Sequence, residues 1–485
     1  MKKFMPNLFK TMLLFFLLVG GISIGVNQTV QAKQIDSNQA ILILSANTKE
    51  ASDLKKELSS LDSEAQIEEI EEINLVKIKA SSSERKKIIE RHFVDKFQFN
   101  TENIGEEQKV QLLDATPNAF SSSKAIDSEI SFLRDSQWDV NQVTQDGKSY
   151  ELQAGNHGVT IGMIDSGIDF NHPDLSKNIV SSGKSFVPGI QDTQDVLGHG
   201  TMVAGSIAAN GTQKGVGPGL GLIPYKVFHN GSADSSWIID AIIEAANDGV
   251  DVINLSLGTY KSPKNKEDRI VIKAYEKAVK YAKKRGVFVV ASAGSSGYDI
   301  TKPFDQNEEH QDLIHLPGGM KGVFTVAATT KEATLASYSN FGRNVDMGAP
   351  GGDYGINFKE NQVFDIDSMI LTTYPVNAPQ SPFATYFGIP KGYDYSAGSS
   401  LASPKVAATA GLIIAEYREL HEKKPNVQTI ERILVKGANH SNEKEQKALF
   451  RHGILDVSHS LELLQYDCVH KEVCFSSPKN DLQFR

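Results

Sequence analysis

The chain has 485 residues, of which 40% are hydrophobic and 22% are charged. This length and balance predict a globular protein with a large core and one or two accessory segments, and they exclude an intrinsically disordered chain. The formal net charge of -9 at pH 7 provides no basic surface for nucleic acid or for an anionic membrane.

The N-terminus is typical of a secretory signal. Met1-Lys2-Lys3 precedes an apolar run at 12–26, and Val30-Gln31-Ala32 supplies the small side chains found before a cleavage site. We expect residues 1–32 to be removed; the alternative is an uncleaved anchor, for which the apolar run is short. The sequence has no later membrane span and no cell-wall sorting tail. We therefore expect a secreted, extracellular protein without membrane contact after signal removal.

Residues 33–100 alternate between the periodicities of strands and helices. An apolar run at 41–44, an alternating strand at 74–78 and an apolar stretch at 93–99 flank charged helical segments at 49–61 and 83–92. This alternation predicts a small α+β domain. Residues 101–134 are polar and serine-rich, which predicts a linker.

From residue 135 to residue 464 strands and helices alternate. Apolar, β-branched runs at 159–164, 250–257, 286–291 and 323–328 are typical of strands buried on both faces of a parallel sheet. Helical patterns at 236–247 and 268–285 lie between them and carry helix-end signals. The sequence therefore predicts a doubly wound α/β domain with a mostly parallel sheet, in which sites gather beyond the carboxyl ends of strands.

Three positions supply an acid, a base and a nucleophile. Asp165 follows the strand at 159–164, His199 precedes a helix of small residues, and Ser400 begins another such helix. Each alone has a structural explanation, as a strand-end acid or a helix cap. Together they can form a relay in which the histidine takes the serine proton while the acid orients the imidazole.

The motifs Asp165-Ser166-Gly167, His199-Gly200-Thr201 and Gly398-x-Ser400-x-Ala402-x-Pro404 resemble, in this order, those of the subtilisin-like serine proteases. The resemblance covers about residues 138–464. It implies that Asp165 is the orienting acid, His199 the general base and Ser400 the nucleophile. It also implies that residues 33–100 are a prodomain that inhibits the enzyme until it is removed.

The same resemblance assigns the substrate contacts. Ser256, Leu257 and Gly258 match the strand that pairs with an extended peptide, and Asp234 and Ser235 match the lining of the outer upstream subsites. For Ser235, capping of the following helix is an equally good explanation.

The sequence departs from the family pattern in two places. Ser295 stands where the family carries the asparagine that donates to the oxyanion, so we expect a slow or substrate-dependent protease with the NH of Ser400 as the remaining donor. Asp174 matches a family calcium ligand, but the loop at 210–215 is shorter than usual and carries Lys214. Calcium therefore stays open as a cofactor, and the sequence points to no other.

The order of signal, prodomain, linker and catalytic domain, with a short tail at 465–485, resembles that of the lantibiotic leader peptidases. This resemblance implies removal of a leader peptide after a basic residue. Two features fit. The acidic run at 305–312 precedes the segment that closes the primary pocket, although a surface loop explains it as well, and Arg134 offers a self-cleavage site. The alternatives are a broad-specificity extracellular endopeptidase and a weakly catalytic peptide-binding homologue.

The two cysteines, Cys468 and Cys474, lie close together near the C-terminus. In an oxidising exterior they could form a disulfide that staples only the tail. The sequence leaves this pairing open.

Overall fold

The computed structural model describes residues 39–96, 103–112, 119–121, 129–301, 312–361, 363–440 and 444–471. The predicted signal at 1–32, most of the acidic run at 305–312 and Cys474 lie outside these residues. Within the described ranges, no helix has the length and apolar character that a membrane span requires.

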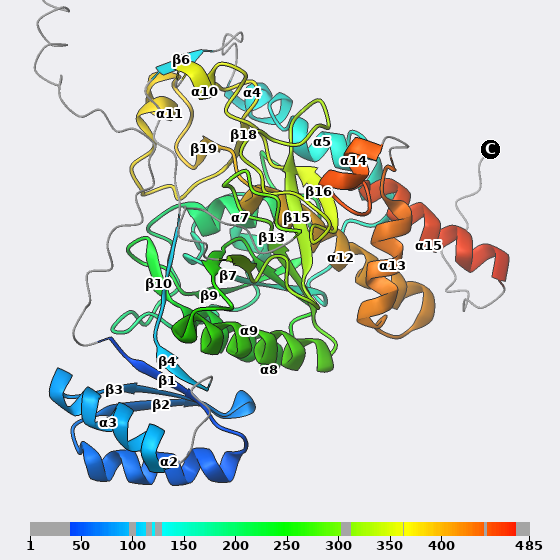
Figure 1. Cartoon of the computed structure of the whole chain (residues 1–485). Coiled ribbons are helices and arrows are strands. Elements are labelled where there is room, and N and C mark those ends of the chain that lie inside the picture. Colours follow the sequence, from blue (N-terminus) through cyan, green and yellow to red (C-terminus); the bar gives the residue numbers. More distant parts are fainter. Residues whose placement is uncertain are drawn as a thin grey trace, which may run out of the picture. The chain divides into compact units, whose positions relative to one another are not determined.

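A seven-stranded sheet forms the centre of the large domain (Figure 1), with the strand order β16-β15-β13-β11-β7-β9-β8. Neighbouring strands pair in parallel, which confirms the predicted doubly wound α/β fold. The chain adds strands on one side of β7 and then on the other, so the switch point lies at the end of β7. The strands are β7 (Thr160–Asp165), β8 (Lys184–Ser185), β9 (Gly221–Lys226), β11 (Val252–Leu255), β13 (Phe288–Ser292), β15 (Phe324–Thr329) and β16 (Met347–Pro350).

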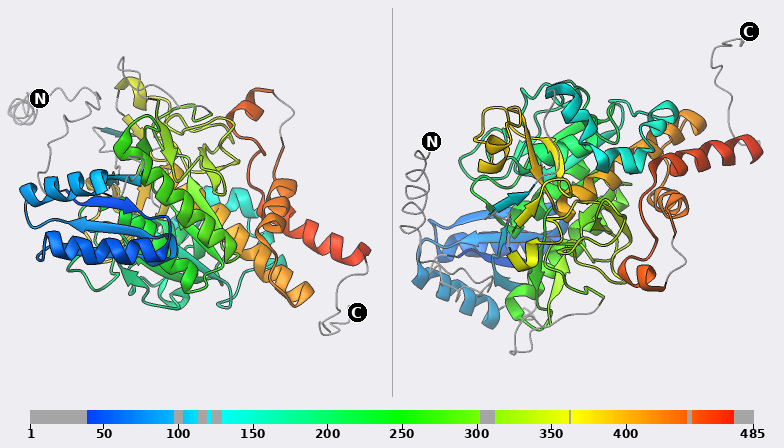
Figure 2. Two further views of the ribbon diagram at one scale, coloured as in Figure 1. Left: turned by 60° about the horizontal axis from the view of Figure 1, so that its bottom comes forward. Right: turned by 90° about the horizontal axis from the view of Figure 1, so that it is seen from above.

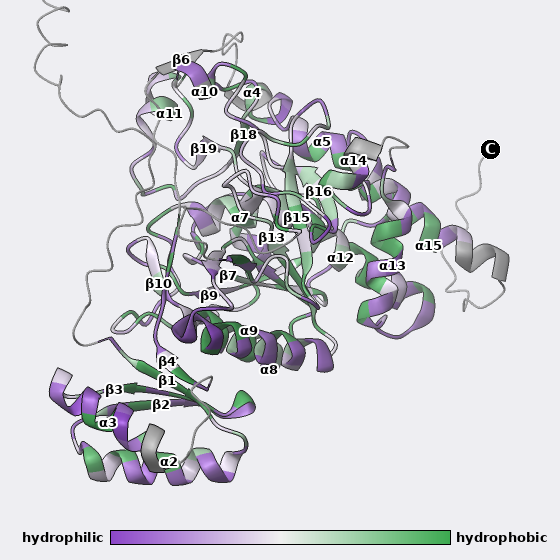
Figure 3. Ribbon diagram, in the orientation of Figure 1, coloured by the Kyte–Doolittle hydropathy of each residue, from purple (hydrophilic) through white to green (hydrophobic). Residues whose placement is uncertain are grey.

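Alternate residues of the central strands enter two cores on opposite faces of the sheet. In β7, Ile161 and Met163 belong to the core that α7 and α12 cover, whereas Ile164 belongs to the core under α8 and α9. Figure 3 shows hydrophobic and hydrophilic residues alternating along α8 and α9, as expected for helices with one buried face. The covering helices are α7 (His199–Ala208), α8 (Ser235–Asn247), α9 (Lys266–Lys284) and α12 (Ser399–His421).

The ends of α9 follow from its flanking residues. Asn265 caps the helix, its side chain accepting a hydrogen bond of 2.9 Å from the NH of Glu267, so the helix starts before the predicted position. It ends before Gly286, whose φ of 78° lies in the left-handed region that glycine favours.

The N-terminal described residues form a four-stranded antiparallel sheet with the order β2-β3-β1-β4 (Figure 2). Ile41 and Ile43 of β1 face the core with α2 and α3, whereas Leu42 and Leu44 enter the core that contains α9. The small domain is therefore packed on both faces of its sheet. Its elements are β1 (Ile41–Leu44), α2 (Thr48–Leu61), β2 (Gln66–Ile70), β3 (Leu75–Lys79), α3 (Ser83–Lys96) and β4 (Ile104–Glu106).

Two predicted boundaries of the small domain differ from the structure. The apolar stretch at 93–99 begins as the end of α3, and the last strand, β4, lies beyond the predicted limit at residue 100. Strand β2 was not predicted, because this partly exposed edge strand has charged residues at its centre.

The predicted linker at 101–134 contains short paired strands. Strand β5 (Lys109–Gln111) pairs antiparallel with β10 (Ser232–Asp234), and β6 (Ala119–Ser121) pairs with β17 (Val363–Asp365). Strands of three residues are too short to show a periodicity in the sequence. The remaining elements are η1 (Glu71–Ile73), α4 (Glu129–Asp135), α5 (Trp138–Thr144), α6 (Lys148–Leu152), η3 (Ser176–Asn178), β12 (Thr259–Lys261), β14 (Ile314–Leu316), α10 (Phe358–Asn361), β18 (Ile370–Thr373), α11 (Pro382–Tyr386), β19 (Tyr393–Ser396), α13 (Val427–Gly437), α14 (Lys444–Leu449) and α15 (Val457–Lys471).

Candidate active site

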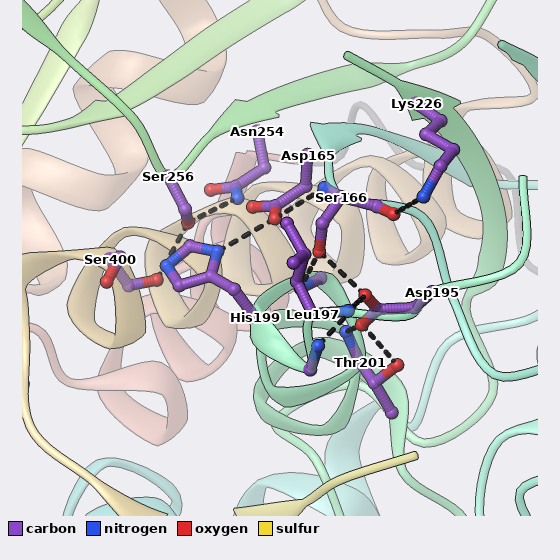
Figure 4. Close-up of polar contacts among 12 residues, drawn as sticks. Asp165, Ser166, Asp195, Leu197, His199, Thr201, Lys226, Asn254, Ser256 and Ser400 are labelled. Atoms are coloured by element: carbon purple, nitrogen blue, oxygen red, sulfur yellow. Dashed lines mark hydrogen bonds and ion pairs between the residues drawn. The ribbon is translucent and has the colours of Figure 1, made fainter. Parts of the chain in front are cut away.

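The structure brings Asp165, His199 and Ser400 together at the carboxyl end of β7 (Figure 4). The Nδ1 atom of His199 lies 2.7 Å from Oδ1 of Asp165, a carboxylate that is only 1% exposed. The imidazole lies between Asp165 and Ser400. A buried carboxylate in this position orients the ring and stabilises its protonated form, as a serine relay requires.

The three side chains come from three well-ordered positions of the fold. Asp165 ends β7, His199 begins α7, and Ser400 is the second residue of α12. A Cβ atom built on Gly398 would lie 2.8 Å from Ser400 Oγ, so the residue before α12 has to be small. The first NH groups of α12 and the positive end of its dipole favour negative charge beside Ser400.

Asp195 connects the strand of the acid to the helix of the base. Its Oδ1 accepts a hydrogen bond of 2.9 Å from Ser166 Oγ and two more of 2.9 Å from main-chain NH groups of its own loop. Its Oδ2 accepts from the NH and the Oγ1 of Thr201, at 2.9 and 2.7 Å. Sequence analysis missed Asp195, although a carboxyl group four residues before His199 was a usable signal.

Lys226 lies fully buried at the end of β9 behind this network (Figure 4). Its ammonium group donates to the main-chain carbonyls of Ser166 and, at 2.9 Å, Gln194. Burial lowers the pKa of Lys226, although nearby carboxylates, Asp195 foremost, oppose this shift. Lys226 thus holds the same two loops from the side opposite to His199.

The side chain of Ser256 contacts the helix of the nucleophile, and the residue also lines the pocket beside Ser400. Its Oγ donates to the main-chain carbonyl of Ser400 at 2.7 Å and lies 3.1 Å from Ser403 Oγ. Asn254 Nδ2 donates to the same Oγ at 2.8 Å. The substrate pairing predicted for Ser256 uses its main chain and stays a prediction, while its side chain supports α12.

A pocket of about 80 Å³ opens beside Ser400. Leu257 and Gly258 contribute to its lining, as do Gly294, Ser295 and His315. Within its described lining there is no acidic, lysine or arginine side chain. Of the predicted acidic run, the structure describes only Asp312, and its carboxylate pairs with Lys264.

An oxyanion donor has to lie close to the start of α12, where the nucleophile is. Ser295 does lie there. Its Oγ is 3.1 Å from Ser399 Oγ and accepts a hydrogen bond of 3.4 Å from the NH of Ser399. The hydroxyl is thus engaged with the residue before the nucleophile. Its role toward an oxyanion stays a prediction.

A segment of the chain itself lies along the edge of the pocket. Val110 of β5 pairs with Ala233 of β10, the NH of Leu112 donates to the carbonyl of Gly231 at 2.8 Å, and Leu112 also lines the pocket. The NH of Ser235 donates to the carbonyl of Gln108 at 2.8 Å. β10 therefore already binds an extended peptide by strand addition.

Asp234 contributes charge as well as main chain to this contact. Its carboxylate lies 3.1 Å from Nζ of Lys77 and 2.5 Å from Nζ of Lys109, both from the N-terminal part of the chain. Arg134, in contrast, lies on α4, where its Nε donates to the carbonyl of Thr212 at 3.3 Å. The peptide bond after Arg134 is close to a helix end and would have to become extended before cleavage.

Asp174, which matches a calcium ligand of the family, accepts hydrogen bonds from other residues of the chain. Its Oδ1 accepts from the NH of Thr212 at 2.7 Å, and its Oδ2 accepts from the NH of Gln213 at 3.0 Å and from the hydroxyl of Tyr393 at 2.7 Å. Three protein donors thus occupy most of the acceptor positions of this carboxylate, and the described residues include no group of three or more acidic, histidine or cysteine side chains that could hold a metal ion.

The chain is similar in sequence to a known protein family and to several of its members. Residues 156–453 match the model of the subtilase family. The epidermin leader peptide-processing serine protease of Staphylococcus epidermidis is 32% identical over 318 residues, which are 59% of this chain and 66% of that protein. The nisin leader peptide-processing serine protease of Lactococcus lactis subsp. lactis is 30% identical over 317 residues, 58% of this chain and 44% of that protein. The alignments thus cover less than two thirds of either relative.

Solved structures agree with the sequence comparison. A crystal structure of a lanthipeptide protease has 33% identity and a TM-score of 0.62, covering 68% of this chain and 95% of that one. The epidermin leader peptide-processing serine protease of Staphylococcus aureus has 28% identity and a TM-score of 0.69, covering 88% of this chain and 98% of that one. The second match also includes most of the residues before the large domain.

Proposed function

Because this chain belongs to the subtilase family of serine peptidases, we propose that it is a secreted endopeptidase that removes the leader peptide of a lanthipeptide precursor after a basic residue. One observation carries this proposal. The relay of Asp165, His199 and Ser400 adjoins a pocket that Gln111 and Leu112 also line, and the segment that contains these two residues is paired with β10.

The geometry supports a two-stage acyl transfer. A substrate strand pairs with β10 and brings its scissile carbonyl to Ser400. His199 takes the proton of Ser400 Oγ while this oxygen attacks the carbonyl carbon, and Asp165 stabilises the charged imidazole. The NH of Ser400, at the positive end of α12, donates to the oxyanion. His199 then protonates the leaving amine, and water releases the acyl group by the same steps.

The substrate class rests on the relatives and on the pocket. Two relatives are named for processing the leader peptides of epidermin and nisin. The described pocket lining has no lysine or arginine side chain to repel a basic residue, and it includes the polar residues Tyr260 and Ser296. The N-terminal signal pattern at 1–32 supports export.

We also propose that the small domain is an intramolecular inhibitor. The segment Lys109–Leu112 pairs with β10, the strand that an upstream substrate segment needs. Both cannot occupy it at once, so activation has to remove the chain through at least Leu112. A mature N-terminus after Arg134 satisfies this requirement, and N-terminal sequencing of the secreted protein tests it.

The substrate class is tested by competition. Purified protein is incubated with an equimolar mixture of a lanthipeptide precursor and casein, and both are followed by mass spectrometry. The proposal predicts one cut at the leader boundary before casein is degraded. Equal degradation of casein at many sites would instead identify a broad endopeptidase. The Ser400→Ala variant is the control for cleavage by a contaminating peptidase.

A further inference from the structure

Helix α9 carries a stripe of lysines along one of its faces. The members of this lysine stripe follow one another at intervals of three or four residues, which places them on the same side of an α-helix: Lys273, Lys277, Lys280 and Lys284. Lysines at this spacing repel one another. Burial lowers the pKa of Lys277, and the nearby charge of Lys273 lowers it further. The stripe therefore weakens the helix unless a segment of opposite charge covers it.

An acidic segment of the small domain covers part of the lysine stripe. This segment is η1, which contains Glu71 and Glu72, and Glu72 lines a pocket of about 220 Å³ together with three of the stripe lysines. The carboxylate of Glu72 also accepts a hydrogen bond of 2.7 Å from Asn247 at the end of α8. Lys277 Nζ donates to the main-chain carbonyl of Ile73 at 3.1 Å. The chain thus places an acidic peptide segment of its own on the stripe.

A continuous segment of the chain connects the lysine stripe with the active-site pocket. At the stripe, Lys273 Nζ donates to Oδ1 of Asn103 at 3.2 Å. Three residues later, the NH of Glu106 donates to the carboxylate of Glu267 at the start of α9, at 2.6 Å. The segment then forms β5, which pairs with β10, and Leu112 lines the pocket. Asn103 at the stripe therefore lies nine positions before Leu112 at the pocket.

We propose that the lysine stripe of α9 is an exosite that binds an acidic segment of the leader peptide, nine or more residues before the residue at the pocket. This inference rests on the proposed function and deepens it. A leader that pairs with β10 continues upstream along the course of the chain's own segment, so its N-terminal part lies against α9. Once activation has removed the small domain, leader carboxylates take the place of Glu72. Because these contacts lie far from the scissile bond, they lower KM and leave kcat unchanged.

The test compares peptides that differ only where they would meet the exosite. Two long peptides share one sequence around the leader boundary, and further upstream one carries a run of glutamates and the other a run of glutamines. Their kcat and KM are measured with the full chain after self-processing and removal of the small domain. We expect wild type to cleave the glutamate peptide with a kcat/KM about tenfold higher, through KM, and this preference should shrink as the ionic strength rises.

Charge reversal assigns the preference to the stripe. Lys280 and Lys284 are exposed even with the small domain present. In Lys280→Glu combined with Lys284→Glu, the preference for glutamate should vanish, and a third peptide with a run of lysines should become the better substrate. If charge reversal blocks self-processing, glutamine at both positions replaces it and should abolish the preference without inverting it. Each preference is a ratio within one preparation, so partial misfolding of a variant does not affect it.

The matched control makes the same change of charge on the other face of the sheet. Lys423 follows α12 and Lys436 lies in α13, two helices of the core opposite to that of α9, and both lysines are exposed. Lys423→Glu combined with Lys436→Glu should keep the wild-type preference for the glutamate peptide. A loss of preference in this control would assign the effect to net charge and refute the exosite.

The failure of the exosite and the failure of the proposed function give different results. If wild type cleaves the glutamate and glutamine peptides equally at low ionic strength, or if the charge-reversed variant keeps the wild-type preference, the exosite is refuted. The peptidase function stands in that case, provided that Ser400→Ala cleaves neither peptide. If wild type itself cleaves neither peptide, the proposed function fails and the exosite fails with it.

Discussion

The hydroxyl of Ser256 donates a hydrogen bond of 2.7 Å to the main-chain carbonyl of Ser400. Ser256, whose main chain is predicted to pair with substrate, thus also holds the nucleophile's helix in place with its side chain. Since Ser256 is only 2% exposed and also accepts from Asn254, its loss leaves two buried polar groups without this partner.

The first prediction concerns this contact. Ser256→Ala should lower kcat about tenfold with little change in KM, because a displacement of Ser400 costs about 1.4 kcal/mol in the transition state. Steady-state kinetics on a leader peptide measure the effect. Thr409→Val is the control, since Thr409 Oγ1 donates an equally buried bond of 2.7 Å to the carbonyl of Lys405 further along α12. An equal loss of kcat in both variants would assign the effect to general destabilisation.

Asp195 provides the second prediction. In Asp195→Asn an amide NH₂ replaces one oxygen and faces N–H or O–H donors, so the loop that carries His199 loses at least one anchor. We expect kcat to fall about tenfold to a hundredfold while KM is nearly kept. Asp456→Asn is the matched control, because Asp456 accepts from Gln145, which follows α5, and from the NH of His459 in α15. A kcat for Asp195→Asn equal to that of the control would refute the positioning role.

The third prediction concerns Ser295, whose hydroxyl is bonded to Ser399. Ser295→Asn places an amide donor at the start of α12 and should raise kcat about tenfold or more, since one oxyanion donor contributes about 100- to 1000-fold. Progress curves with a good peptide measure it, and Ser296→Asn serves as the neighbouring control. Unchanged turnover in Ser295→Asn would mean that the oxyanion is already fully satisfied.

A buried ion pair gives the fourth prediction, on stability. Lys405 Nζ lies 2.7 Å from Asp139 Oδ2, and the two side chains are 0% and 2% exposed. Lys405→Met leaves a buried charge and should cost about 3–5 kcal/mol, whereas Asp139→Leu combined with Lys405→Met should recover most of this loss. Urea unfolding in the Ser400→Ala background measures the free energy without self-digestion. The exposed pair of Lys184 and Glu244, 2.9 Å apart, should contribute less than about 1 kcal/mol.

The fifth prediction is a pH dependence. Burial lowers the pKa of His315 from 6.5 to about 4, so its contribution to stability is present above pH 6.5 and is lost as the pH falls toward 4. Burial raises the pKa of Asp346 from 3.8 to about 6, so its contribution is present below pH 3.8 and is lost as the pH rises through 6. The two groups therefore oppose each other over this range.

Comparing the unfolding free energies of wild type and His315→Asn isolates the contribution of the histidine to the pH dependence. In the Ser400→Ala background, their difference in unfolding free energy should change by about 3 kcal/mol between pH 7 and pH 4, in favour of the variant at low pH. Asp346→Asn should show a change of the opposite sign. A difference that does not vary with pH would contradict the neutral, buried state of His315.

The large domain was predictable because the sequence patterns that indicate its strands and helices are local. Strand β7 is a continuous apolar run, and Asp165, His199 and Ser400 each sit at the end of an element that the sequence pattern marks. The switch-point rule then places Asp165 at the site. Element ends shifted by a few residues, as for α9, because caps such as Asn265 decide them.

The missed features depend on contacts between distant segments. Strand β5 has no periodic pattern and forms only because β10 supplies its hydrogen bonds. His315 lies in the run Leu313-Ile314-His315-Leu316, for which no role was predicted, and only the packing of its ring against Gly258 and Gly294 shows that it lines the pocket. A single sequence gives no signal for such a pairing.

Leader cleavage in this cleft depends on Ser400. The most direct test is mass spectrometry of a lanthipeptide precursor incubated with wild type, with Ser400→Ala and with Thr409→Val. The account predicts one new peptide that begins at the leader boundary with wild type and Thr409→Val, and an intact precursor with Ser400→Ala. An intact precursor with all three proteins, or equal cleavage by Ser400→Ala, would contradict it.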